Sequence, residues 1–195
     1  GSSVTQSGLL YYVMSQDVLG FSSSSDTLGA AVNFASGTLT TNSASGSAYP
    51  TGLPIDAWRL ISTPSVLNET GLTQVFDELG TQDNTVWRVF RYDNVSNTYK
   101  DNPVDLNSTE SYWIYQKTED NLTMDTPAGK TGDMSGTEIT LKTGWNFIGS
   151  PYPFQVPLQL DQVQFYGPLT YGISGESWSP VVTELDPWNG YVVYN

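Results

Sequence analysis

Two segments of the sequence have the same layout, and this repetition limits the folds that the chain can adopt. Residues 57–64 read AWRLISTP and residues 144–151 read GWNFIGSP, so tryptophan, a polar residue, two apolar residues, two small residues and proline follow in the same order. Residues 189–195 (NGYVVYN) likewise repeat residues 111–117 (SYWIYQK). Because recurring sequence patterns mark repeated structural units, we predict two diverged copies of one unit.

Both copies are expected to consist mainly of β-strands. Aromatic residues make up 13% of the chain, and its 18 glycines and 11 prolines favour short strands and tight turns over helices. We therefore predict an all-β, β-sandwich-like fold with one short helix near residues 70–80, where Leu72, Val75, Phe76 and Leu79 recur at helical spacing. Thr70 or Asn68 is expected to cap this helix, and Gly80 to end it.

The predicted organisation has five parts. The two copies occupy residues 53–118 and 139–195, and a connector at 119–138 separates them. A hairpin is expected at the start of the second copy, with Ile139 and Leu141 pointing inward. Ahead of the first copy we expect a Ser/Thr/Gly-rich linker at residues 41–52 and, at residues 1–40, either the closing strands of a preceding sandwich or an N-terminal β extension.

The composition excludes several functional classes. The chain has no cysteine and no histidine, so a Ser-His-Asp triad, a Cys-His pair and a typical zinc site are impossible. With 20 Asp+Glu against 7 scattered Lys+Arg, a net charge of -13 would repel nucleic acid. No apolar run is long enough to span a membrane. We expect a chain that is not an enzyme, although carboxylate-based glycosidase chemistry remains open.

The segments GWNFIGSPYPF and WNGYVVYN, with AWRLISTP and SYWIYQK before them, resemble a tandem β-rich module of long secreted or surface proteins of Bacteroidota and related bacteria. Many such proteins are exported by type IX secretion. GLLYYVMSQDVLGFSSS is in turn similar to the end of an immunoglobulin-like or fibronectin type III-like domain. The resemblance implies an extracellular or cell-surface location, with the export signal outside these residues, and no catalytic residues.

The tryptophans are the candidate ligand-binding residues. Trp58 and Trp145 occupy matched positions within apolar alternation, so we expect them in the core. Trp178 and Trp188 lie in loop sequences (SWS and PWNG), and with Tyr152 and Tyr171 they are predicted to contact a ligand. Sugar rings stack their C–H faces on such rings, which makes polysaccharide the expected ligand.

Calcium is the one cofactor that the sequence suggests. Oxygen-bearing side chains gather between residues 93 and 105, and hard oxygen ligands suit Ca²⁺. The candidate ligands are Asp93, Asn97, Asp101 and Asp105. The alternative is that these residues bond their own backbone in turns.

Three functions follow from these patterns. The first is a non-catalytic structural or adhesive module that docks neighbouring domains of a larger protein. The second is a carbohydrate-binding module, and the expected partner of the module is polysaccharide or another surface protein. The third is a self-associating subunit, because the N-terminal strands would have unpaired edges that pair either with the tandem module or with another chain.

Overall fold

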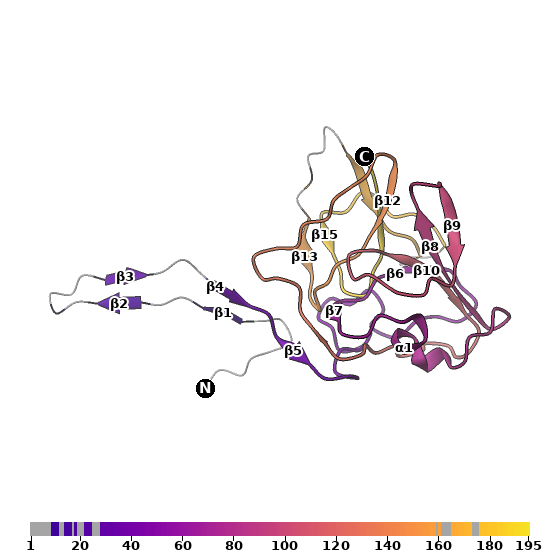
Figure 1. Ribbon diagram of the computed structural model, residues 1–195, viewed down its shortest axis with the longest axis horizontal. Helices are drawn as coiled ribbons and strands as arrows, with labels where there is room; N and C mark the ends of the chain where they lie inside the picture. The colour runs from indigo at the N-terminus through magenta and orange to yellow at the C-terminus, as the bar shows by residue number, and fades with distance from the viewer. Residues whose placement is uncertain are drawn as a thin grey trace.

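The structure is a computed structural model, which describes residues 9–11, 14–16, 18, 22–24, 28–158, 160, 165–172 and 176–195 (Figure 1). The protein is nearly all β, with 34% of residues in strands and 4% in helix, arranged in several antiparallel sheets. This confirms the predicted all-β, sandwich-like fold. In the described part of the chain, no helix is long and apolar enough to cross a membrane.

Each copy builds one main sheet and has further strands outside it. The strands of the first copy are β6 (Arg59–Ile61), β7 (Val66–Leu67), β8 (Trp87–Asp93), β9 (Thr98–Asp101) and β10 (Tyr112–Gln116). Those of the second copy are β12 (Trp145–Ile148), β13 (Val156–Pro157), β14 (Tyr166–Leu169), β15 (Glu184–Leu185) and β16 (Tyr191–Tyr194).

The two sheets have the same topology. The first has the order β6-β10-β8-β9 and the second the order β12-β16-β14, so in both copies the last strand lies between the first strand and the middle strand. Strands β13 and β15 form a separate pair. The repeated sequence therefore corresponds to a repeated strand order.

A tyrosine corner is also repeated. The hydroxyl of Tyr112, in β10, accepts a hydrogen bond of 2.6 Å from the backbone N–H of Asn107, and that of Tyr191, in β16, accepts one of 2.7 Å from Asp186. In both cases the donor lies five residues before the tyrosine. Burial raises the pKa of both phenols above the ordinary value, so both stay protonated.

The two copies interlock at the ends of their first strands. Ile61, at the end of β6, forms a bridge with Asn189 of the second copy, and Ile148, at the end of β12, forms a bridge with Glu110 of the first copy. Ile61 and Ile148 occupy the same position in the two copies, and so do Asn189 and Glu110, so the two contacts correspond to each other. The copies therefore pack around an approximate twofold axis.

The helix is shorter than expected. Helix α1 (Leu72–Val75) is followed at once by the 3-10 turn η1 (Asp77–Leu79), and Gly80 ends it with φ 71°. Gly71, without a side-chain hydrogen bond, stands at the N-cap, so neither Thr70 nor Asn68 caps the helix. The apolar stripe packs against Trp87, Val89 and Ile114 in a core that we call the larger core.

The expected linker and connector are packed against the first copy. Within residues 41–52, Ala44 and Tyr49 are buried in the larger core, and the Tyr49 hydroxyl donates to the carbonyl of Leu60. In the connector, Leu122 and Met124 belong to the same core. A Ser/Gly-rich composition predicts flexibility, and here a few apolar side chains within that composition anchor the segment instead.

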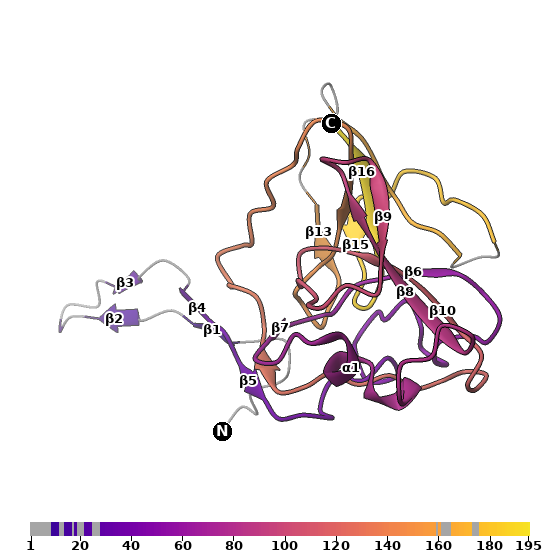
Figure 2. The ribbon, with the colours of Figure 1, turned by 45° about the vertical axis from the view of Figure 1, so that its right-hand side comes forward.

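The N-terminal strands lie apart from the two sheets. Strand β1 (Leu9–Tyr11) pairs with β4 (Leu28–Ala30), and β2 (Met14–Gln16) pairs with β3 (Ser22–Ser24). Figures 1 and 2 show these strands extending away from the rest of the chain. Strand β5 (Asn33–Phe34) connects them to it by pairing with β11 (Gly129–Lys130) of the connector, which also pairs with β7.

The hairpin expected at the start of the second copy does not form. Residues 137–142 are not in a strand, although Ile139 and Leu141 are half-buried and alternate with exposed neighbours as predicted. The side chain of Asn146 takes the place of strand pairing: it accepts from the Lys142 N–H at 2.8 Å and donates to the Lys142 carbonyl at 2.7 Å.

Candidate functional site

One side of both sheets is lined with aromatic rings. Side chains alternate between the two faces of a strand, so Leu60, Phe90 and Trp113, which lie opposite one another in the first sheet, share a face. In the second sheet Phe147 and Val192 are paired in the same way. Leu60 and Val192 belong to one small core, against which Trp113 and Phe147 pack. This core joins the two sheets beneath a common surface.

We call this surface the aromatic face. It contains two hollows, of about 430 and 340 Å³. The first is lined by Trp58, Phe90, Tyr99, Trp113, Tyr171 and Trp178. The second is lined by Tyr92, Tyr99, Trp145, Phe147, Leu169, Trp178 and Val192. Every residue in the two linings is aromatic or aliphatic, so the face offers mainly ring surfaces to a ligand.

The rings of the first hollow support one another. The centroids of Trp113, Tyr171 and Trp178 lie 5.1 to 5.9 Å apart in edge-to-face contacts. A β-bridge joins Tyr171 to Trp178, and the Thr170 N–H donates to Ser179 Oγ at 3.0 Å beside it. These contacts fix the Trp178 ring, which lowers the entropy cost of binding a ligand.

Polar groups lie beside two rings of the first hollow, because Arg88 contacts Phe90 and Tyr115 contacts Trp58. Arg88 forms an ion pair of 2.6 Å with Asp101, and its guanidinium lies 4.7 Å from the centroid of the Phe90 ring. The Tyr115 hydroxyl donates to Asp56 at 2.9 Å. The apolar hollow thus has hydrogen-bonding groups beside its rings, the arrangement typical of small-ligand sites.

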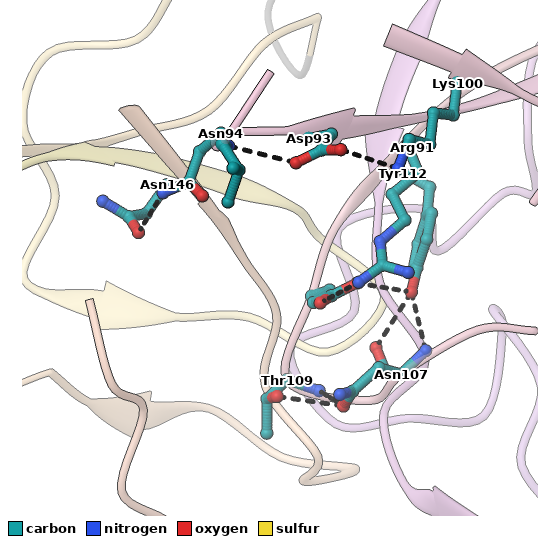
Figure 3. A network of polar contacts seen from close by, with 10 residues as sticks. Arg91, Asp93, Asn94, Lys100, Asn107, Thr109, Tyr112 and Asn146 are labelled. Carbon is teal, nitrogen blue, oxygen red and sulfur yellow. Dashed lines mark hydrogen bonds and ion pairs between the residues drawn. The ribbon is translucent and has the colours of Figure 1, made fainter. Parts of the chain in front are cut away.

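A polar cleft of about 260 Å³ adjoins the second hollow, and both are lined by Tyr92 and Phe147. In the network of Figure 3, Arg91 pairs with Glu110 at 2.6 Å, and Glu110 also accepts from the Tyr112 hydroxyl. Lys100 pairs with Asp93 at 2.6 Å and holds the pKa of that carboxyl well below its usual range. These pairs join β8 to β9 and to the loop before β10.

Only two of the four predicted ligand residues reach this surface. Trp178 is 46% exposed and lies with Tyr171 in the first hollow. Trp188 and Tyr152 are buried, at 1% and 7% exposed. Trp188 packs in the larger core, and the Tyr152 hydroxyl donates to the Asp133 carbonyl. The structure therefore places neither Trp188 nor Tyr152 on the aromatic face.

The expectation that Trp58 and Trp145 lie in the core was wrong. They are 37% and 39% exposed and line the first and second hollow respectively. The residues that the sequence interpretation missed are those on alternate strand positions, such as Phe90, Tyr99 and Trp113. Phe90 and Tyr92, and Trp113 and Tyr115, stand two residues apart within their strands, and this spacing is the signal that could have indicated Phe90 and Trp113.

The four predicted calcium ligands do not converge. Asp93 pairs with Lys100, and Asp101 with Arg88. Asn97 accepts a hydrogen bond from the Tyr92 hydroxyl, and Asp105 accepts one from Thr70. Each of the four side chains has its own partner, so the structure does not bring them together as one site.

A different acidic cluster forms beside the 3-10 turn. Oxygen atoms of Asp77, Glu78 and Asp125 lie within 4.8 Å of one another. Glu78 accepts a hydrogen bond from the Asp125 N–H, while its second oxygen is buried and unpaired. Burial, and then the nearby carboxylates, raise the pKa of Glu78 to about 7.

Glu78→Gln is expected to stabilise the fold at pH 8 by about 1–2 kcal/mol and to have little effect at pH 4. Below the ordinary carboxyl pKa of 4.5, Glu78 is protonated in both the folded and the unfolded chain. Between pH 4.5 and 7 only the unfolded chain releases the proton, so wild-type stability falls as the pH rises, whereas glutamine stays neutral. Glu78 is partly exposed to water, so the change in the free energy of unfolding is expected to be smaller than its full pKa shift would give.

Urea denaturation of both proteins between pH 4 and pH 8 measures this difference in the free energy of unfolding. A difference that stays constant across this range contradicts the raised pKa.

Comparison with known protein families, with curated proteins and with solved structures finds no match to this chain. The fold and the aromatic face therefore define it as an all-β chain with an internal repeat and an exposed aromatic surface, and its function is inferred from these features.

Proposed function

We propose that this chain is a non-catalytic adhesive module of an extracellular or cell-surface protein, and that it binds polysaccharide on its aromatic face. The observation that carries the proposal is the exposure of Trp58, Trp145 and Trp178 over two apolar hollows. Soluble proteins seldom leave large contiguous apolar patches on their surfaces unless those patches bind a partner or ligand.

A sugar chain fits the chemistry of this surface. The C–H face of a sugar ring is apolar and packs on an aromatic ring, and its hydroxyl groups lie at the ring's edge. The rings of the first hollow would cover the C–H faces, while the Arg88–Asp101 pair and Asp56 beside these rings would bond hydroxyls. Apolar contact supplies affinity, and the few polar groups supply orientation.

A glycan array probed with the whole chain tests the proposal. Wild-type protein is expected to bind at least one polysaccharide, and Trp178→Ala to weaken that binding about 10-fold, because the ring lines both hollows. Val104→Ala removes an exposed apolar side chain that lines neither hollow and serves as the matched control. Absence of any glycan signal above background would refute the carbohydrate-binding function.

Self-association is a second candidate function, and the N-terminal strands favour it. In the part of the chain that the structure describes, β1–β4 and β2–β3 are two-stranded sheets, so each offers a sheet edge that can pair with another chain. Light scattering coupled to size exclusion is expected to show dimers or larger species that depend on these strands. A strict monomer at all concentrations would rule this function out.

A further inference from the structure

The aromatic face is built twice, once by each copy. Trp58 and Trp145 occupy the same position in AWRLISTP and GWNFIGSP, and Tyr115 and Tyr194 occupy the same position in the last strands β10 and β16. The ring centroids of Trp58 and Tyr115 are 5.2 Å apart, and so are those of Trp145 and Tyr194. The repeat therefore extends to the exposed side chains.

The floors of the two hollows are equivalent as well. Trp113 of β10 lies opposite Phe90 of β8, and Val192 of β16 lies opposite Leu169 of β14. Three positions of the repeat therefore line both hollows, occupied by Trp58, Phe90 and Trp113 in the first and by Trp145, Leu169 and Val192 in the second.

The hollows are also adjacent. Tyr99 and Trp178 line both of them, so they share one wall. Tyr99 contacts Phe147 of the second sheet edge-to-face at 6.0 Å, and Trp178 contacts Trp113 of the first at 5.9 Å. A glycan bound in one hollow would therefore contact residues that also line the other.

We infer that the two hollows are paired, equivalent subsites for one extended glycan chain. This inference rests on the proposed polysaccharide-binding function and adds its geometry. One binding unit in each copy would engage successive parts of the same polymer, so the affinity of a long chain would exceed that of a short one through effective concentration.

The lining also indicates the class of sugar. An axial hydroxyl pressed onto a ring would lose its hydrogen bonds to water without replacing them, which costs free energy. A neutral polymer with equatorial hydroxyls, such as β-1,4-linked glucose or N-acetylglucosamine, avoids this cost. The net charge of -13 disfavours acidic glycans.

Calorimetric titration with β-1,4-linked disaccharides and hexasaccharides of glucose and of N-acetylglucosamine tests the inference. The wild-type chain is expected to bind two molecules of the preferred disaccharide. It is expected to bind one molecule of the matching hexasaccharide, about 100-fold more tightly.

Variants of the two matched tryptophans separate the subsites. Trp58→Ala and Trp145→Ala are each expected to bind one disaccharide and to lose most of the advantage of the hexasaccharide, whereas Trp178→Ala weakens both subsites. Val104→Ala is the control that leaves binding unchanged. If an alanine variant fails to fold, Trp58→Leu or Trp145→Leu is used in its place, because leucine keeps apolar contact with the residues beneath the tryptophan.

The outcomes distinguish this inference from the function on which it rests. A single disaccharide per wild-type chain, or loss of all binding in only one of the two tryptophan variants, overturns the paired subsites but leaves polysaccharide binding intact. If neither hexasaccharide binds while the array shows another glycan, the inference also falls and the function stands. If no glycan binds in either experiment, both are wrong.

Discussion

Trp188→Ala is expected to lower the free energy of unfolding by about 3–5 kcal/mol, the usual cost of emptying a large aromatic site in a core. The Trp188 side chain is 1% exposed and packs in the larger core, in the same cluster as Tyr49, Ile61 and Tyr112. Its carbonyl accepts a hydrogen bond from the Ser62 N–H at 3.2 Å, at the junction of the two copies. A cavity here would weaken the contact between the copies.

Trp178→Ala is the matched control, because it removes the same side chain from an exposed position. It is expected to lower the free energy of unfolding by about 1–2 kcal/mol, because it loses two edge-to-face ring contacts but leaves no buried cavity. Urea denaturation followed by far-ultraviolet circular dichroism measures both variants without relying on tryptophan fluorescence. Equal losses in the two variants would contradict the assignment of Trp188 to the core and Trp178 to the surface.

Gly190→Ala is expected to lower the free energy of unfolding by about 3 kcal/mol, through overpacking. A Cβ at Gly190 would lie 2.6 Å from Ser111 Cβ and 2.7 Å from Leu60 Cγ. In the structure Tyr191 corresponds to Tyr112, so Gly190 corresponds to Ser111, one residue away from the alignment of 189–195 with 111–117. Near the approximate twofold axis a residue meets its own counterpart, so only one member of the pair has room for a side chain.

The second pair of matched residues at the contact between the copies is crowded in the same way. Gly149 is the equivalent of Ser62, and a Cβ at Gly149 would lie 2.5 Å from Ser62 Cβ. The physical reason for the divergence of the copies at these two positions is thus steric, and it is local to the axis.

Gly46→Ala provides the control for this prediction. Gly46 has φ 74°, and the nearest atom to an added Cβ is Gln155 Cβ at an ordinary 3.7 Å. Its cost is therefore the left-handed backbone conformation alone, about 1 kcal/mol. Thermal and urea denaturation compare the two variants, and a Gly190→Ala protein as stable as Gly46→Ala would contradict the close packing at the axis.

The fold was largely predictable from the sequence because its signals are local. The matched segments at Trp58 and Trp145 indicated the repeat, and the spacing of Leu72 and Leu79 indicated the helix. The hairpin before Trp145 was wrong because Asn146 satisfies the backbone of Lys142 by a side-chain contact. An alternating apolar pattern predicts a strand, but it does not show that a side chain such as Asn146 will form the hydrogen bonds in place of a partner strand.

The candidate site was less predictable. An aromatic residue within a strand looks the same in sequence whether its face is covered or open, so Trp58 and Trp145 were assigned to the core. A tryptophan in a loop sequence looks exposed, yet the loop of Trp188 folds back into the larger core. The local pattern gives the alternation of faces, while burial depends on what another part of the chain covers.

The sequence by itself determined the all-β class, the two copies and the absence of histidine and cysteine chemistry, because these depend on composition and local periodicity. Only the tertiary structure decided that the copies interlock around an approximate axis, that Ser62 and Ser111 face glycines there, and that one face of both sheets stays open. The physical reason is that burial and close approach arise between residues far apart in the chain, as when Gly190 meets Leu60.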